Sequence, residues 1–304
     1  MVTKKDKQRQ YQIEYHLVRI VGIIVQALPQ SVAIFVGRLF GDIFYHVIKI
    51  RKDRAFQNLK ASFGSEKSDK ELKRILKDNY RHFGIMLIEF ARFPNMNRDS
   101  LLQKITVVDE PTIREAFSHD SGILFLSGHF GNWEILAAYL ASCGRPLHAV
   151  FKEQKNKSID KIIKEYREKV GLIPIKVKGE AARGTLRAFK LKATVLIVND
   201  QDAGGKGMFI DFFGRPASTS TGPAIIALKT RVPVYCVFCV RRTGSHYEIF
   251  IEKFPDLENL QADDEGINRF LITYNKILEK YIKQYPEQWF WMHRRWKTQK
   301  KKQS

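Results

Sequence analysis

The chain has 304 residues, of which 44% are hydrophobic and 12% aromatic, and its 52 lysines and arginines outnumber its 32 aspartates and glutamates. This composition excludes a disordered chain, and the length allows one large domain with or without an appendage. The net charge of +20 predicts an acidic partner, such as nucleic acid, an anionic membrane surface or an acidic protein.

The most hydrophobic long stretch runs from residue 17 to residue 50. It lacks the roughly 18 uninterrupted apolar residues of a membrane span, because polar residues and a proline interrupt it: Arg19, Gln26, Pro29, Arg38 and Asp42. Three interpretations stay open: a short span near 17–28 followed by an interfacial helix, two amphipathic helices that lie on a membrane, or a helical hairpin buried on the domain. Residues 1–60 hold 11 Lys/Arg against 4 Asp/Glu, which favours membrane contact.

Two helices are expected next, at 51–64 and 69–92, the second because apolar residues recur at spacings of three and four. From about residue 105, short apolar runs alternate with helical segments, which is typical of an α/β fold with a largely parallel sheet. The expected strands are 123–126, 147–151, 172–177, 195–198, 208–212, 232–240 and 247–251. The expected helices begin near Asn132, Ser158, Glu180, Thr221 and Asp264.

The stretch Ser127-Gly-His-Phe-Gly-Asn-Trp-Glu134 joins the strand at 123–126 to the following helix. His129 therefore lies at the C-terminal end of a strand, where open α/β sheets bind ligands. Glu134 falls in the first helical turn, and a carboxylate turned toward the imidazole fixes its tautomer and raises the basicity of the free nitrogen. This pair can deprotonate a hydroxyl. The alternative is an ordinary loop histidine.

Basic residues are concentrated between residues 151 and 192, with 13 Lys/Arg against 5 Asp/Glu. Lys152, Asn156 and Arg167 lie just after the second strand or in the helix that follows it. A basic cluster beside a catalytic cleft suits a phosphorylated substrate. The alternative is a solvated helix face.

Two further groups lie near strand ends. Asp200 and Asp202 follow the strand at 195–198, where carboxylates can orient a base, bind sugar hydroxyls or cap a turn. The hydroxyl-rich segment 218–222 precedes a helix, and we expect an anion site there with Arg215 beside it. The aromatic and basic segment 286–297 suits either a membrane interface or a packed C-terminal staple, and the tail from Trp296 onward is expected to fray.

The cysteines and histidines predict no metal site, since the eight histidines show no ligand spacing with carboxylates or cysteines. Cys236 and Cys239 fall in an apolar, strand-like run. We expect them to be buried reduced thiols, which suggests a reducing compartment.

Together these motifs resemble those of the bacterial lipid A biosynthesis acyltransferases, the late acyltransferases of the inner membrane. The motifs are 128–134, Asn156 with Arg167 and Gly171, 200–202, 212–216 and 286–289, and the resemblance covers nearly the whole chain. It implies a glycerolipid-acyltransferase-like α/β fold, with a membrane-anchoring helical segment at 1–50 and an acyltransferase domain at 51–304. That domain divides into a helical part at 51–104, an α/β core at 105–285 and a C-terminal aromatic and basic segment at 286–304.

The same resemblance implies a chemistry. His129 and Glu134 form the catalytic His-x4-acid dyad, an acyl–acyl carrier protein thioester is the donor and co-substrate, and a phosphorylated glucosamine lipid, a lipid A precursor, is the acceptor. No other cofactor is expected. The expected substrate-binding residues are Lys152, Asn156, Arg167, Asp200, Asp202 and Arg215. Lys152 departs from the family, which usually has arginine there, and lysine loses bidentate phosphate binding.

The expected location is the cytoplasmic face of the inner membrane, where the positive charge suits both anionic lipid and the acidic carrier protein. One alternative is an acyl-CoA-dependent enzyme of the same architecture that acylates a mannosylated phosphoinositide, because the dyad does not separate the two. A nucleic-acid-binding protein is disfavoured, because no helix-turn-helix, zinc-finger or RNP motif is found and the hydrophobic segment 17–50 has no place in it.

Overall fold

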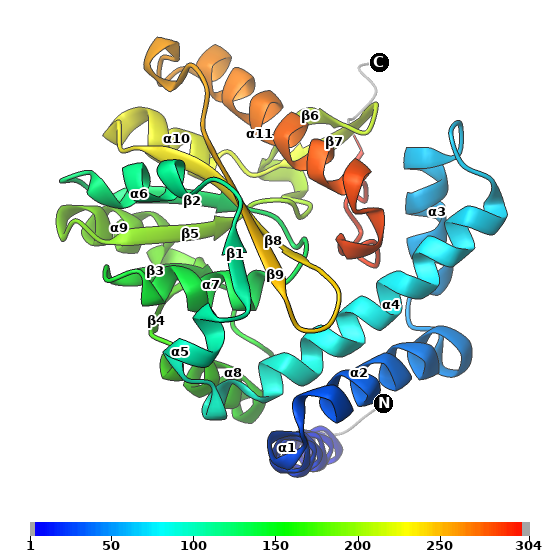
Figure 1. The fold of residues 1–304 in the computed structure, drawn as a ribbon. Helices are drawn as coiled ribbons and strands as arrows, with labels where there is room; N and C mark the ends of the chain where they lie inside the picture. Colours follow the sequence, from blue (N-terminus) through cyan, green and yellow to red (C-terminus); the bar gives the residue numbers. More distant parts are fainter. Residues whose placement is uncertain (1–3, 300–304) are drawn as a thin grey trace.

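The computed structural model describes residues 4–299, and it has a central seven-stranded sheet with helices on both faces (Figure 1). The strand order is β1-β9-β8-β2-β5-β3-β4. β8, β2, β5, β3 and β4 are mutually parallel, and β9 is antiparallel to β8 and parallel to β1. The sheet strands are β1 Ile105–Val107, β2 Ile123–Ser127, β3 Leu147–Phe151, β4 Leu172–Lys176, β5 Thr194–Val198, β8 Val234–Arg241 and β9 Tyr247–Lys253. The predicted α/β class with a largely parallel sheet is confirmed.

The α-helices of the described chain flank this sheet or extend from it. They are α1 Lys4–Ala27, α2 Gln30–Ile43, α3 Lys52–Phe63, α4 Asp69–Ala91, α5 Arg98–Leu102, α6 Glu110–Ser118, α7 Trp133–Ser142, α8 Lys157–Lys169, α9 Val177–Lys190, α10 Gly222–Thr230 and α11 Asp264–Gln284. The helices expected at 51–64 and 69–92 correspond to α3 and α4, and all five predicted helix starts fall within three residues of a helix start.

Strand β8 is apolar from residue 234 to residue 240 because both of its faces are covered. Cys236, Phe238 and Val240 belong to the core that α9, α10 and α11 cover, whereas Tyr235, Val237 and Cys239 belong to the core under α6 and α7. A parallel strand buried on both faces needs such a continuous apolar run. The sheet therefore holds the C-terminal strand ends rigidly.

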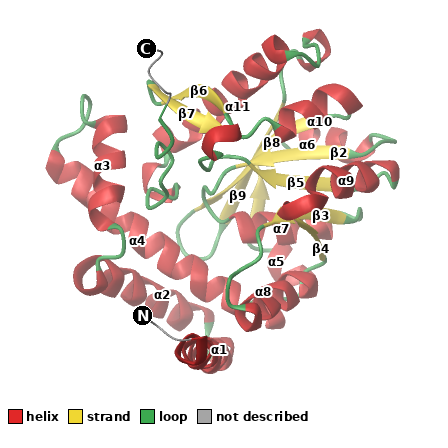
Figure 2. Ribbon diagram, turned by 180° about the vertical axis from the view of Figure 1, so that it is seen from behind, coloured by secondary structure: helices red, strands yellow, loops and turns green. Residues whose placement is uncertain are grey.

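The N-terminal helices lie outside this layered core, and α4 passes between α2 and the sheet in both views (Figures 1 and 2). α2 touches α4 backbone to backbone: a Cβ on Gly37 would lie 2.6 Å from the Ile85 Cα, and one on Gly41 would lie 2.4 Å from the Arg81 Cα. Only glycine permits such a close approach. One face of α2 is therefore fixed to the folded chain.

Helices α1 and α2 also carry an apolar surface that is exposed. The exposed side chains include Leu17, Ile20 and Ile24 on α1, and Val32, Phe35 and Leu39 on α2. Residues Gln30–Ile48, which are α2 and the π-helical turn Phe44–Ile48, are long and apolar enough to cross a membrane by length and composition, although this stretch is mostly exposed rather than buried. Soluble monomers rarely expose so large an apolar surface.

The fold differs from the prediction in three respects. The strand at 208–212 does not join the main sheet: β6 Met208–Phe212 pairs with β7 Arg215–Thr219 in a separate antiparallel hairpin. Four elements were not predicted: β1, β7, α5 and α6. Strand β1 has only three residues and β7 lacks an apolar run, so neither strand shows a hydrophobic period. α1 also begins at Lys4, within the polar stretch before the hydrophobic segment. The boundary at residue 50 stays a prediction.

Candidate active site

The loop that carries His129 is clamped between β8 and the C-terminal segment. The Asn132 N–H donates to the Cys239 carbonyl over 2.8 Å, and the Gly131 N–H donates to the Gln288 carbonyl over 2.9 Å. Gly131 has a φ of +60°, and a Cβ there would lie 1.9 Å from the Cys239 carbonyl oxygen. Glycine is therefore required at position 131 for both its conformation and its lack of a side chain.

A buried carboxylate from the neighbouring strand holds the imidazole. The Nδ1 of His129 lies 2.7 Å from Oδ1 of Asp200, and the His129 backbone N–H donates to Oδ2 over 2.9 Å. The Trp289 indole N–H donates to the same Oδ2 over 2.7 Å. Asp200 is 2% exposed, whereas the His129 side chain is 24% exposed. The register Ser127↔Val198 between β2 and β5 brings the two strand ends together.

These contacts define the protonation state of the pair. Burial alone would raise the pKa of Asp200, but the adjacent His129 and the hydrogen bonds from His129 and Trp289 outweigh it and hold the pKa of this carboxyl below its ordinary value. An ionised carboxylate accepts the Nδ1 proton, which leaves Nε2 of His129 as the nitrogen able to accept a proton. The imidazole is thus oriented as a base.

Glu134 lies in the same cavity as His129 but pairs with Arg167. Asn132 caps α7, its side chain accepting from the Ile135 N–H, and this places Glu134 in the first turn. The Arg167 guanidinium donates to both Glu134 oxygens, over 2.5 Å and 3.0 Å, and lies 3.8 Å over the ring of Phe151. The structure therefore brings the two predicted dyad members into one cavity and gives each a different partner.

Two cavities meet beside His129. The first, the His129 cavity, has a volume of about 390 Å³ and also contains Glu134, Lys152 and Arg167. The second, the apolar cavity, has a volume of about 350 Å³, and nine of its fifteen lining residues carry only hydrocarbon side chains. The two cavities share Val150, Val177, Val198 and Gln201. Both volumes are typical of ligand sites, which span about 300–1,000 Å³.

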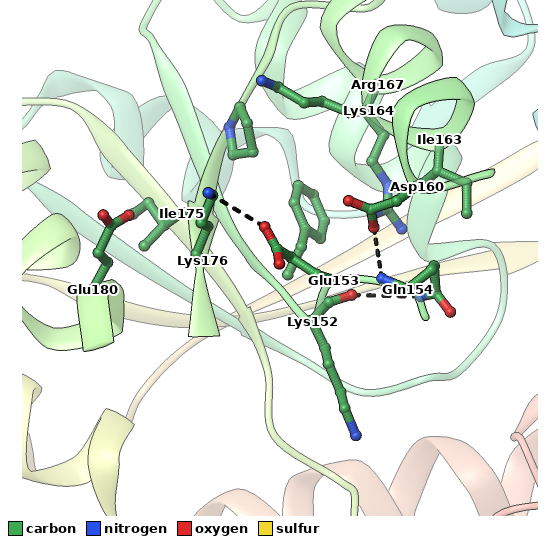
Figure 3. Close-up of a pocket in the computed structure, with 12 residues that line it drawn as sticks. Lys152, Glu153, Gln154, Asp160, Ile163, Lys164, Arg167, Ile175, Lys176 and Glu180 are labelled. Carbon is green, nitrogen blue, oxygen red and sulfur yellow. Dashed lines mark hydrogen bonds and ion pairs between the residues drawn. The ribbon is translucent and has the colours of Figure 1, made fainter. Parts of the chain in front are cut away.

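A third, smaller cavity of about 170 Å³ adjoins the first, and most of its lining residues are charged and lie in β4, α8, α9 and the loop after β3 (Figure 3). Glu153 pairs with Lys176 over 3.3 Å across this cavity, and Asp160 accepts from the Gln154 backbone N–H over 2.6 Å. Lys152 and Arg167 line both this cavity and the His129 cavity. Lys152 extends away from Asp160 in Figure 3, and among residues 4–299 no carboxylate lies within 4.0 Å of its Nζ.

Three other predicted substrate-binding residues lie elsewhere. Asn156 is buried where α1 meets α8: it caps α8 and donates to the Tyr11 carbonyl over 3.0 Å. Asp202 lines the apolar cavity and holds Thr298. Arg215 begins β7, which leads toward α10, and its guanidinium lies 4.3 Å over the ring of Trp296.

The C-terminal aromatic segment is a packed staple, which decides between the two interpretations of the sequence. Trp289, Trp291 and Trp296 are buried, and Phe290 N–H donates to the His129 carbonyl over 3.0 Å. Fraying from Trp296 onward was therefore a wrong prediction for residues 296–299, and residues 300–304 lie outside the described chain. The predicted sites missed Trp289, and only its place in the 286–289 motif pointed to it.

Both strand cysteines are free and buried, as expected, and burial raises the pKa of the Cys236 and Cys239 thiols. Within residues 4–299, no group of three or more histidine, cysteine, aspartate or glutamate side chains could hold a metal ion.

A carboxylate-held histidine at a polar cavity, next to a largely apolar one, can deprotonate a hydroxyl close to a bound hydrocarbon group. Residues 2–298 match the family described as bacterial lipid A biosynthesis acyltransferase. The chain belongs to this family and is an O-acyltransferase.

The relatives agree with this assignment. The chain is 27% identical over 278 residues to a lipid A biosynthesis palmitoleoyltransferase of Escherichia coli, which covers 89% of this chain and 87% of the relative. It is 26% identical to a lipid A biosynthesis lauroyltransferase of the same organism, over 92% and 89% of the two chains. It is also 25% identical to a phosphatidylinositol mannoside acyltransferase of Mycolicibacterium smegmatis, over 68% and 67%.

Proposed function

We propose that this enzyme transfers a fatty acyl chain from an acyl–acyl carrier protein thioester to a hydroxyl of a lipid A precursor. The family and the two enterobacterial relatives support the acceptor class. The observation that carries the chemistry is the 2.7 Å contact between His129 Nδ1 and Asp200, which leaves Nε2 as the free base at a cavity joined to an apolar one.

In the proposed reaction, Nε2 of His129 removes the proton of the acceptor hydroxyl while the oxygen attacks the thioester carbonyl carbon. The tetrahedral intermediate collapses, the carbon–sulfur bond breaks, and the imidazolium returns its proton to the departing thiolate. Asp200 holds the imidazole and stabilises its charged form. General base catalysis of this kind contributes roughly 10²–10⁴-fold to the rate.

The two cavities divide the substrates between them. The apolar cavity suits the hydrocarbon chain of the donor, whereas the polar His129 cavity suits the acceptor headgroup. Lys152 supplies a cation that has no carboxylate partner among residues 4–299, and we assign it to acceptor phosphate. Glu134 holds the Arg167 fork in place, so we assign this pair to shaping the headgroup site rather than to orienting His129.

Mass spectrometry of lipid products tests this function. Membranes that contain the wild-type enzyme, given acyl carrier protein thioesters and a tetra-acylated lipid A precursor, should add one acyl chain, and His129→Ala should add none. His246→Ala changes an exposed histidine in the turn between β8 and β9 and should behave like wild type. No product with the wild-type enzyme would refute the proposed substrates, and normal product with His129→Ala would refute the base.

The mycobacterial relative supports a second candidate, an acyltransferase that acts on a mannosylated phosphoinositide from acyl-CoA. The same assay separates the two functions when each acceptor is offered with each donor. Transfer to the mannosylated lipid alone would favour the second candidate.

We propose further that α1 and α2 attach the enzyme to the cytoplasmic face of the inner membrane. Their exposed apolar side chains support an interfacial position, and the Gly37 and Gly41 contacts keep α2 along α4. Glutamate at the exposed positions Ile20, Ile24, Phe35 and Leu39 should weaken binding to anionic vesicles at least tenfold in a flotation assay. Glutamate at Val108 and Leu191, which are exposed elsewhere, is the control and should leave binding unchanged. Equal flotation of all three proteins would contradict the proposal.

A further inference from the structure

We propose that the side-chain amide of Gln201 stabilises the oxyanion of the reaction by donating a hydrogen bond to the carbonyl oxygen of the acyl thioester. This inference rests on the proposed transfer of an acyl group from a thioester. It gives a catalytic role to a residue that neither the dyad motif nor the basic cluster includes.

The first observation is the position of the amide relative to the base. Nε2 of Gln201 lies 3.3 Å from Nε2 of His129 and 3.4 Å from its Nδ1. The amide is therefore almost equidistant from the two ring nitrogens, and because Asp200 already occupies Nδ1 at 2.7 Å, Nε2 is the ring nitrogen left to accept its N–H. A donor at this distance from the base reaches an oxygen on the carbon that the acceptor attacks, because that carbon is one bond from the oxygen held by the base.

The second observation is the place of Gln201 between the two cavities. With the chain in the apolar cavity and the attacking hydroxyl in the His129 cavity, the thioester carbonyl must lie where the cavities join. Four described residues line both cavities, and three of them are valines. Gln201 is the fourth, and its amide is therefore the only side-chain hydrogen-bond donor at this junction among residues 4–299.

The third observation is the support of the chain on both sides of this residue. The Asn199 N–H donates to the Ser127 carbonyl over 3.1 Å, and Asp200 is fixed by His129 and Trp289. On the other side, the buried Arg295 contacts the Gln201 carbonyl over 3.5 Å and donates to the Ser218 carbonyl over 2.6 Å. A donor on a backbone held in this way needs little reorganisation when charge develops, which is the condition for effective oxyanion stabilisation.

The step balances without any further reactant. The acceptor hydroxyl displaces the Gln201 amide from Nε2 and gives its proton to His129, and the new carbon–oxygen bond moves an electron pair onto the carbonyl oxygen. Gln201 donates its amide N–H to that oxygen. The electron pair then returns, the carbon–sulfur bond breaks, and the thiolate takes the proton from His129.

Steady-state kinetics with the full-length enzyme tests this role. Gln201→Ala should lower kcat by about 10²–10³-fold, the loss typical of removing one oxyanion donor, while the KM for the donor changes less than threefold. Gln201→Met keeps the length of the side chain without a donor and should lose as much. Gln261→Ala is the control, since Gln261 is an exposed glutamine that lines neither cavity, and its kcat should stay within about twofold of wild type. A kcat for Gln201→Ala within threefold of wild type would overturn the inference.

A binding measurement separates this failure from failure of the proposed function, because it needs no acceptor and no turnover. The probes are a dodecanoyl-pantetheine ketone, in which CH₂ replaces the thioester sulfur, and its counterpart that lacks the carbonyl oxygen. The wild-type enzyme should bind the ketone more tightly, and Gln201→Ala and Gln201→Met should lose this preference. A preference that persists in both variants would assign the carbonyl contact to another group. Wild type that binds neither probe would instead refute the thioester site.

Discussion

The two acidic residues near His129 are held in different ways. Asp200 follows β5 and is 2% exposed, and within residues 4–299 its hydrogen bonds come from His129 and Trp289. Glu134 lies in the first turn of α7 and lines the His129 cavity, and the Arg167 fork occupies both of its oxygens. The support of the base therefore comes from strand ends and the C-terminal staple, whereas Glu134 is held from α8, by an arginine that lies over the ring of Phe151.

This difference teaches that the nearest acid in sequence is not the nearest acid in space. Glu134 is five residues from His129, and Asp200 is 71 residues away. Because β2 and β5 are neighbouring parallel strands, their C-terminal ends bring His129 and Asp200 into direct contact. A helix start turns the Glu134 side chain toward α8, where Arg167 meets it.

The largest effect is expected for Asp200→Asn. An amide that turns its NH₂ toward Nδ1 favours the wrong tautomer of His129, so kcat should fall by about 10³–10⁴-fold while the melting temperature changes little. The measurement is the initial rate of acyl transfer, with circular dichroism to verify the fold.

The distinction between Asp200 and Glu134 would fail if Asp200→Asn kept more than a tenth of the wild-type rate. The role assigned to Asp200 would then pass to Glu134, as the resemblance to the family implies. A variant that fails to fold can be replaced by Asp200→Glu, which keeps the charge but shifts its position and should also be slow.

A smaller effect on the rate is expected for Glu134→Gln. The Arg167 side chain is 18% exposed, so the charge left without a partner should cost about 1–3 kcal/mol of unfolding free energy, less than the 3–5 kcal/mol of a fully buried pair. We expect kcat to fall about tenfold and the KM for the acceptor to rise, because Arg167 loses its fixed position.

Urea unfolding and acceptor titration measure these two quantities. Glu153→Gln is the matched control, because the exposed pairs of Glu153 with Lys157 and Lys176 should each contribute less than about 1 kcal/mol. If the rate fell more for Glu134→Gln than for Asp200→Asn, the roles assigned to these two acidic residues would have to be exchanged.

The sequence predicts the parts of this site that depend on local pattern. The strand before His129, the helix start at Asn132 and the strand before Asp200 all have clear apolar runs, so their positions at one edge of a parallel sheet follow. The pairing of His129 with Asp200 does not follow, because it depends on strand order, which no local pattern contains. The hydrogen bond from Trp289 to Asp200 also cannot be predicted from the sequence, since Trp289 lies in a segment without a helix or strand period.

The smallest effect concerns the support behind the His129 loop. Nε2 of His82, on α4, lies 3.0 Å from the Gly131 carbonyl oxygen. Burial and, to a smaller extent, the charge of Arg241 lower the pKa of His82 to about 3, although the contact with Gly131 acts in the opposite direction. His82 therefore stays neutral in the folded protein at pH values where the unfolded chain, with an ordinary pKa near 6.5, takes up a proton.

This difference makes stability depend on pH in a known direction. Since the unfolded state binds the extra proton, the contribution of His82 is complete above pH 6.5 and is lost as the pH falls toward 3, by at most about 1.4 kcal/mol per pH unit. His82→Gln removes the titrating group, so its unfolding free energy in urea should fall less steeply between pH 6.5 and pH 4.5 than that of wild type. The two slopes should coincide between pH 7 and pH 8, where neither state takes up the proton. Equal slopes below pH 6.5 would mean that His82 takes up its proton without unfolding, and the support behind Gly131 would then be open to solvent.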